Sequence, residues 1–352
     1  MGTTETDPSV TVNETLASRV LIGRGAVGQV ADEAARLDAR RVLLVSTPSA
    51  ATAADRVSAA LGARLAGRFG RPVKHVPVEV TAEAMTLVED TGADCVIEIG
   101  GGSAIGLGKA VARRTGMPQI AVPTTYSGSE TTAVVGETEN GVKTTHHALA
   151  VAPGTIVYDP DLTLTMPPGL TRTSAVNSLA HAVEALWSPD ATMLSDALAT
   201  ESAAGILTAL PEVLADPTGP DGRARLLSAA WLSGLCLSKI RTGLHHQLAH
   251  VLGGAYDLPH AELHTLLLPH VMRFNLPSAP AAASRLARVT GGDPTETVAA
   301  LARAHDGPTR LSDLGVPRAE LRDVAERVVA APYPNPRQPT VDAVTELLNE
   351  AW

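Results

Sequence analysis

The sequence contains little cysteine, few aromatic residues and no excess of positive charge. Its two cysteines, Cys95 and Cys236, lie far apart without the spacing of a zinc site, which argues against a disulfide framework and a zinc knuckle. Aromatic residues make up only 3% of the chain, so Ala, Val and Leu must fill most of the core. The net charge of -9 argues against a nucleic-acid partner, because a phosphate-backbone binder needs clustered Lys and Arg.

Long apolar runs are also missing. No stretch approaches about 18 uninterrupted apolar residues, and residues 1–10 are polar and acidic, unlike a signal peptide. We therefore expect a cytoplasmic protein that is neither secreted nor inserted in a membrane. With 352 residues, 45% of them hydrophobic, the chain is long enough for two domains with separate cores.

The first half alternates short β-branched apolar runs with segments of helical period, the pattern of βαβ units and a parallel sheet. Strands are predicted at 41–45, 73–78, 94–99 and 119–123, and helices at 53–66, 82–91 and 104–114. Residues 130–160 lack a helical period and contain the hairpin-type turn Glu139-Asn140-Gly141, which predicts an antiparallel excursion.

After Asp159-Pro160-Asp161 the sequence changes to Ala- and Leu-rich helical segments separated by Pro and Gly. The pattern predicts an α/β Rossmann-like dinucleotide-binding domain over residues 1–160. It predicts an all-helical catalytic domain over residues 161–352.

Two polar loops follow predicted strands. Gly100-Gly101-Gly102-Ser103 lies between a strand and a helix, where glycines allow close backbone approach and the helix N-terminus can bind a pyrophosphate. The segment 123–130, PTTYSGSE, follows the next strand and carries hydroxyls at the sheet edge where α/β folds bind ligands. We expect Thr124, Thr125 and Ser129 to contact the same dinucleotide.

Histidines are concentrated in the second half. Six of the eleven lie at His181 or between His245 and His264. Three pairs have i, i+4 spacing, which places both members on one helix face: Asn177 and His181, His246 and His250, His260 and His264. Such a cluster can present acid and base groups or metal ligands.

Four segments together resemble the iron-containing (group III) alcohol dehydrogenase superfamily: GGGSAIGLGKA, PTTYSGSE, AVNSLAHAVEAL and GLHHQLAHVLGGAYDLPHAE. Within it they are most similar to the maleylacetate reductases. The resemblance implies a dehydroquinate synthase-like architecture, NADH or NADPH as cofactor, a small-molecule substrate and a homodimer. It implies hydride transfer to the enone or ketone of a small oxo acid such as maleylacetate, which would give 3-oxoadipate.

In metal-dependent members of that superfamily, a carboxylate and three histidines bind Fe²⁺ or Zn²⁺, and these positions correspond here to Asn177, His181, His246 and His260. Because a neutral amide replaces the carboxylate, metal affinity should fall. We expect a metal-free site. The alternative is an iron- or zinc-dependent alcohol dehydrogenase or aldehyde reductase in which the metal polarises the carbonyl.

Two further departures concern ligands. Many superfamily members carry an acidic residue at the end of the second strand, which excludes NADPH, whereas this chain has Ser46 and Thr47 there. NADPH should therefore be accepted at least as readily as NADH. In maleylacetate reductases the segment that corresponds to 143–151 is rich in arginine, but here it has none. Either another group binds the substrate carboxylates or the substrate is not maleylacetate.

Histidine suits oxyanion stabilisation and proton delivery near neutral pH. We expect His246 and His260 to perform these tasks, His181 and His250 to support them, and Tyr126 to lie over the substrate. A lyase of the dehydroquinate synthase type is less favoured, because its phosphate-bearing substrate calls for Lys and Arg, and none occurs between His245 and His264. A non-catalytic nucleotide sensor would not need so many titratable groups.

Overall fold

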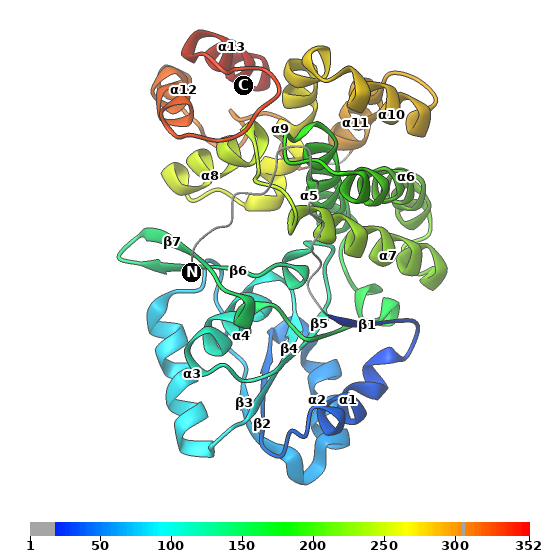
Figure 1. Ribbon diagram of the computed structural model, residues 1–352, viewed down its shortest axis with the longest axis vertical. Helices are drawn as coiled ribbons and strands as arrows, with labels where there is room; N and C mark the ends of the chain where they lie inside the picture. Colours follow the sequence, from blue (N-terminus) through cyan, green and yellow to red (C-terminus); the bar gives the residue numbers. More distant parts are fainter. Residues whose placement is uncertain (1–17, 305–306) are drawn as a thin grey trace, which may run out of the picture.

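A computed structural model describes residues 18–304 and 307–352, with a sheet-based N-terminal half and a helical C-terminal half (Figure 1). The main sheet has six parallel strands in the order β1-β8-β5-β4-β2-β3. They are β1 (Arg19–Ile22), β2 (Val42–Ser46), β3 (Leu65–Phe69), β4 (Cys95–Gly100), β5 (Gln119–Pro123) and β8 (Thr155–Tyr158).

Helices cover both faces of this sheet. α1 (Val30–Arg36) and α2 (Ala51–Leu61) pack on one face, and α3 (Val78–Thr91) and α4 (Gly102–Thr115) pack on the other. β2, β4 and β5 are buried at every position, as expected for parallel strands covered on both sides. The expected α/β fold is therefore confirmed.

The predicted strand at 73–78 is wrong. Pro72 and Pro77 bracket this segment, and His75 and Val76 have left-handed backbones, with φ of 63° and 48°, so the chain turns there. The strand is instead β3, which lies at the edge of the described sheet and pairs with β2. The predicted helix at 53–66 is too long, because α2 ends at Leu61 before Gly62, whose φ is 53°.

The antiparallel excursion is present but shorter than expected. β6 (Val134–Glu139) and β7 (Val142–His147) pair antiparallel through a turn in which Asn140 and Gly141 both have positive φ. The rest of the segment returns to the main sheet as β8, which lies between β1 and β5. β8 was missed because its partner β1 lies far away in sequence.

Beyond residue 158, every regular element that the structure describes is a helix. These are α5 (Pro168–Trp187), α6 (Met193–Ala215), α7 (Pro220–Leu237), α8 (Leu244–Tyr256), α9 (His260–Asn275), α10 (Pro280–Thr290), α11 (Pro294–Arg303), α12 (Leu321–Ala330) and α13 (Val341–Ala351). α6 has the length and composition of a membrane span; 39% of its apolar window is buried, and it packs against α5 and α7.

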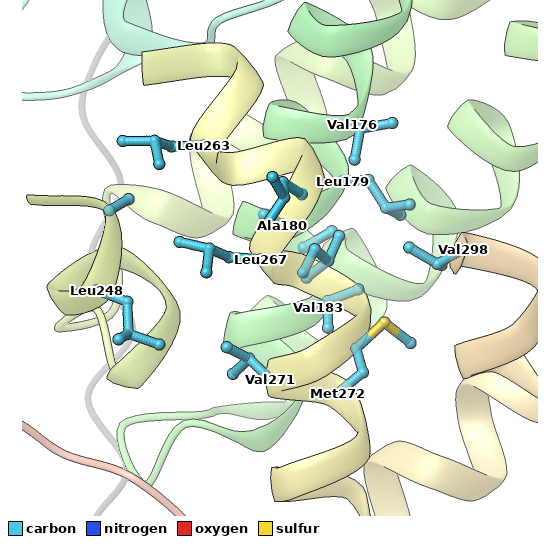
Figure 2. Close-up of a cluster of buried hydrophobic side chains, with 14 of the residues drawn as sticks. Val176, Leu179, Ala180, Val183, Leu248, Leu263, Leu267, Val271, Met272 and Val298 are labelled. Carbon is cyan, nitrogen blue, oxygen red and sulfur yellow. The ribbon is translucent and has the colours of Figure 1, made fainter. Parts of the chain in front are cut away.

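α5 runs through the centre of the helical half. It is buried at every position from Thr171 to Trp187, and it packs against α6, α7 and α9. Figure 2 shows Leu179 and Val183 of α5 beside Leu267 of α9 in this core. A helix buried on all sides holds its polar side chains in fixed positions, and α5 carries Asn177, His181 and Glu184.

Candidate active site

The triple glycine forms a sharp turn between β4 and α4. Gly100 has a φ of 152°, which side-chain-bearing residues rarely adopt, and a Cβ there would lie 2.7 Å from Cγ2 of Thr47. A Cβ on Gly102 would meet no atom within 4 Å, so open space lies beside the first turn of α4. Within the described residues no side chain caps this helix, which leaves its N-terminus available to a phosphate.

The expected cofactor residues lie along one edge of the sheet. Thr47 follows β2 and touches Gly100, and a Cβ on Gly101 would lie 3.0 Å from Cγ2 of Thr125. The backbone N–H of Thr124 donates to the Gly100 carbonyl at 3.0 Å, which joins the ends of β5 and β4. The Thr125 hydroxyl is buried and has no partner within the described chain, as expected for a group that awaits a ligand.

Three residues of the expected set remain, and one of them, Ser129, is half-buried in the short 3-10 turn that follows β5. Ser46 is the last residue of β2 and is buried, and Ser103 is half-buried in the first turn of α4. The structure thus brings together the sequence-predicted cofactor residues that follow β2, β4 and β5.

Sequence reasoning missed Lys109, which holds the loop after β5 in place. This lysine on α4 is 1% exposed, and its Nζ donates to the backbone carbonyls of Ser129, Thr132 and Val134. Burial lowers the pKa of Lys109 to about 7, although Glu130 and Glu98 act in the opposite direction. Lys109 belongs to the segment GGGSAIGLGKA, so its position on the helix after the glycine turn could have indicated this role.

The histidines of α5, α8 and α9 form one cluster. Ring centroids are separated by 5.1 Å for His181 and His246, 6.2 Å for His246 and His250, and 6.1 Å for His250 and His260. The structure therefore brings together the four histidines selected from the sequence. His250 and His260 are exposed, whereas His181 and His246 are buried.

Two more histidines complete the cluster. His264 lies 4.7 Å from both His245 and His246 between ring centroids, and 4.2 Å from His260. Both His245 and His264 are fully buried. The i, i+4 spacing of His260 and His264 was visible in the sequence, but only the packing of α8 on α9 shows that His264 faces His246.

Several polar atoms of this cluster are buried and have no hydrogen-bond partner among the described residues. They are Asn177 Oδ1, His181 Nδ1, His245 Nδ1, His246 Nε2, and Nδ1 and Nε2 of His264. Buried polar atoms are normally bonded, so a concentration of unpaired ones indicates a place for a ligand or bound water.

Glu184 is the other residue that sequence reasoning missed. It lies on α5 one turn after His181 and is 1% exposed. Its Oε2 accepts a hydrogen bond from Nδ1 of His246 at 2.6 Å. A carboxylate three residues after a selected histidine on the same helix was a visible but unused signal.

Burial favours the neutral form of the four buried histidines of the cluster. It lowers the pKa of His246 to about 3 and that of His245 to about 4, and it lowers the pKa of His181 and His264 well below the usual range. Burial also raises the pKa of Glu184, against the backbone N–H groups that stabilise its charged form.

The expected position of Tyr126 over the substrate is wrong. Its side chain is fully buried, and its hydroxyl accepts a hydrogen bond from Nη1 of Arg223 at 3.1 Å. The backbone N–H of Tyr126 donates to Ser174 on α5 at 2.9 Å. Tyr126 therefore packs in the core of the helical half instead of facing the histidines.

The loop after β5 contacts the histidine cluster directly. Gly128 has a φ of 76°, and a Cβ on it would lie 3.6 Å from Nδ1 of His181. This loop also carries Thr124 and Thr125, so the sheet edge with the glycine turn continues into the histidine cluster. A dinucleotide on that edge can extend its reactive end toward His181.

The residues that could bind a divalent metal in this site carry little negative charge. The four positions of the superfamily metal site carry an amide and three imidazoles and no anionic oxygen, and Glu184 is engaged with His246 and backbone N–H groups. A different group, His245, His246 and His264, has ligand nitrogens within 4.8 Å of one another, but it also lacks an anionic oxygen. Neither set fits the carboxylate-containing site of metal-dependent relatives.

Comparison with family models matches the chain in two parts. Residues 17–160 match the model of iron-containing alcohol dehydrogenases, and residues 171–352 match the C-terminal model of the same family. Together these matches cover nearly all of the chain.

Individual proteins are similar over almost their whole length. A maleylacetate reductase of Sphingobium indicum is 41% identical over 341 residues, 97% of each chain, and one of Burkholderia cepacia is 42% identical over 335 residues, 95% of each. The crystal structure of maleylacetate reductase from Rhizobium sp. strain MTP-10005 superposes with a TM-score of 0.93 at 40% identity, covering 98% of both chains.

Proposed function

Because the chain belongs to the iron-containing alcohol dehydrogenase family, and is therefore an NAD(P)H-dependent oxidoreductase, we propose that it is a maleylacetate reductase. The observation that carries this proposal is the close approach of the loop at Gly128 to His181, which joins the cofactor edge to the histidine cluster. The similarity to maleylacetate reductases over nearly the full length supports the substrate.

The cofactor residues would act as follows. Gly101, Gly102 and Ser103 would hold the pyrophosphate at the N-terminus of α4, and Thr124, Thr125 and Ser129 would hold the nicotinamide end. Ser46 and Thr47 would face the adenosine ribose, where they oppose neither NADH nor NADPH. When bound, the cofactor supplies a hydride to the β-carbon of the substrate enone.

The histidines would manage charge on the substrate. His246 and His260 would stabilise the oxyanion that develops on the carbonyl oxygen and deliver the proton to the enolate, with His181 and His250 beside them. A dicarboxylate favours the protonated form of neighbouring imidazoles, because opposite charges raise a histidine pKa. This would allow the cluster to bind substrate carboxylates although residues 143–151 contain no arginine.

We propose that the site works without a metal. The amide of Asn177 contributes no negative charge, and Glu184 is already bonded to His246. A Lewis acid is also not required where protonatable histidines surround the carbonyl oxygen.

We propose further that the domains divide at residue 160, between β8 and α5, and that the protein is a cytoplasmic homodimer. The edge strand β1 supports a dimer, because among the described strands it pairs with β8 alone and leaves Ile22 37% exposed. Light scattering after gel filtration tests the oligomeric state.

The function is tested by following oxidation of NADH and NADPH with maleylacetate, other 4-oxo-2-enoates and simple aldehydes. We expect maleylacetate to be reduced with the highest kcat/KM. His246→Ala and His260→Ala should each lower turnover by about 10²-fold or more. His270→Ala is a matched control outside the cluster and should stay within about twofold. Faster reduction of simple aldehydes would contradict the proposed substrate.

A further inference from the structure

Glu184 is a buried carboxylate that binds three donors from one short segment. Its Oε2 accepts from Nδ1 of His246 at 2.6 Å and from the backbone N–H of Gly243 at 3.2 Å, while its Oε1 accepts from the backbone N–H of His245 at 3.0 Å. A buried carboxylate is costly unless its oxygens are hydrogen-bonded, and here both are.

These contacts define the tautomer of His246. The backbone N–H groups of Gly243 and His245 stabilise the ionised form of Glu184, and an ionised carboxylate can only accept hydrogen bonds. With Glu184 ionised, the hydrogen between it and His246 belongs to Nδ1, which leaves the lone pair of the neutral ring on Nε2. Nε2 is buried and has no partner in the described residues, so it is the nitrogen left for a ligand.

The same carboxylate anchors the start of α8. Gly243 and His245 flank the first residue of this helix, where N–H groups lack intrahelical partners and the helix dipole favours a negative charge. A Cβ on Gly243 would lie 3.2 Å from Oε1 of Glu184 and 2.9 Å from the Pro334 carbonyl, so the segment fits tightly. Glu184 thus links the buried helix α5 to both the backbone of α8 and the ring of His246.

We propose that Glu184 is a positioning residue, which fixes the ring orientation of His246 and holds its proton on Nδ1 so that Nε2 faces the substrate. Nε2 becomes a donor when the ring takes up a second proton from solvent, which the negative charges of the bound substrate favour. This inference rests on the proposed role of His246. If Glu184 were merely structural, replacing it would lower stability whether or not His246 is present. If it positions His246, replacing it lowers turnover only while His246 is present.

A double-mutant cycle tests this difference. Glu184→Gln keeps the size of the side chain but replaces one acceptor oxygen with a donor. We expect kcat with maleylacetate to fall about 10- to 100-fold while KM for NADPH stays unchanged. In a His246→Ala background the same substitution should change kcat by less than about threefold. Equal losses in both backgrounds would overturn the proposal.

Two variants separate positioning from folding. Glu184→Asp retains the carboxylate and should recover part of the kcat lost in Glu184→Gln. Glu33→Gln is the matched control, because Glu33 is also a buried carboxylate but lies on α1, away from the histidines, and pairs with Arg19 of β1 and Arg36 of α1. It should lower the melting temperature without lowering kcat of the folded protein.

A measurement without turnover keeps the inference separate from the proposed substrate. The ¹⁵N chemical shifts of the His246 ring should show a proton on Nδ1 and none on Nε2 in the wild type, and a mixture of tautomers in Glu184→Gln. If no 4-oxo-2-enoate is reduced, the proposed function fails while this result still decides the role of Glu184. A protonated Nε2 in the neutral wild-type ring, or shifts unchanged by Glu184→Gln, would overturn the proposal.

Discussion

Gly128 and Gly234 pack backbone to backbone where the loop after β5 meets α7. A Cβ on Gly128 would lie 3.1 Å from the Cα of Gly234, and a Cβ on Gly234 would lie 2.8 Å from the Gly128 carbonyl oxygen and collide with the Thr131 hydroxyl. Neither position has room for a side chain. This close approach brings the loop within reach of His181.

Gly234→Ala should therefore destabilise the protein and displace the loop. We expect a loss of about 1–3 kcal/mol in the free energy of unfolding, because the added methyl group meets backbone on the facing loop. Gly254→Ala, on α8 in open space, is the control and should be neutral or slightly stabilising. Denaturant unfolding measures both, and an unchanged midpoint for Gly234→Ala would contradict the packing.

Gly102→Val should abolish dinucleotide binding without unfolding the protein. No atom lies within 4 Å of a Cβ at this position, so the side chain would occupy space left for the pyrophosphate. Gly101→Val should have the same effect, with some additional loss of stability from its contact with Thr125. Calorimetric titration with NADPH measures binding, and wild-type affinity in Gly102→Val would remove the glycine turn from the cofactor site.

The two nicotinamide cofactors should be used comparably, with NADPH disfavoured by no more than about tenfold, roughly 1.4 kcal/mol. Ser46 and Thr47 place no negative charge beside the ribose. Thr47→Asp should introduce one and shift the ratio of kcat/KM values toward NADH. A wild-type preference for NADH of about a hundredfold or more would show that another group excludes the 2′-phosphate.

Purified protein should contain well under one equivalent of iron or zinc, and a chelator should leave the rate unchanged. Asn177→Asp should raise the affinity for divalent metals, because it restores the anionic oxygen beside the histidines. Asn177→Gln, which adds no charge, is the control for this variant. Stoichiometric iron or zinc in the wild type, with activity lost on chelation and restored by that metal, would favour the metal-dependent alcohol dehydrogenase alternative.

The buried histidines should make stability fall as the pH falls below about 6.5. In the unfolded chain they titrate near that value, whereas burial holds the pKa of His246 at about 3 and that of His264 well below the usual range. The unfolded state therefore binds more protons in this window, and acidification favours it. Buried carboxyls with a raised pKa, such as Glu184, act in the opposite direction.

The comparison of two variants isolates the histidine contribution. His264→Gln should reduce the slope of unfolding free energy against pH by up to about 1.4 kcal/mol per pH unit between pH 6 and 5. His147→Gln, on the exposed hairpin, should leave the slope unchanged. Urea unfolding at a series of pH values gives both slopes, and equal slopes for wild type and His264→Gln would contradict the expectation.

Local patterns in the sequence were sufficient for much of the fold. The buried runs of β4 and β5, the glycine turn after β4 and the helical periods after residue 160 depend on neighbouring residues, so the sequence alone predicted them. The strand expected at 73–78 failed because β-branched residues there are interrupted by prolines and left-handed turns. The pairing of β8 with β1 joins segments more than a hundred residues apart, which no local pattern encodes.

The candidate site likewise combines features that the sequence predicts with features that only the tertiary structure decides. Histidine spacing placed each pair on one helix face, and together with the superfamily resemblance it led to the selection of His181, His246, His250 and His260. Only the packing of α5, α8 and α9 decided that Glu184 and His264 lie against His246, and that Tyr126 points into the core. The reason is physical: residue types and short spacings set what a segment can do chemically, whereas contacts between helices depend on the burial of the whole apolar core.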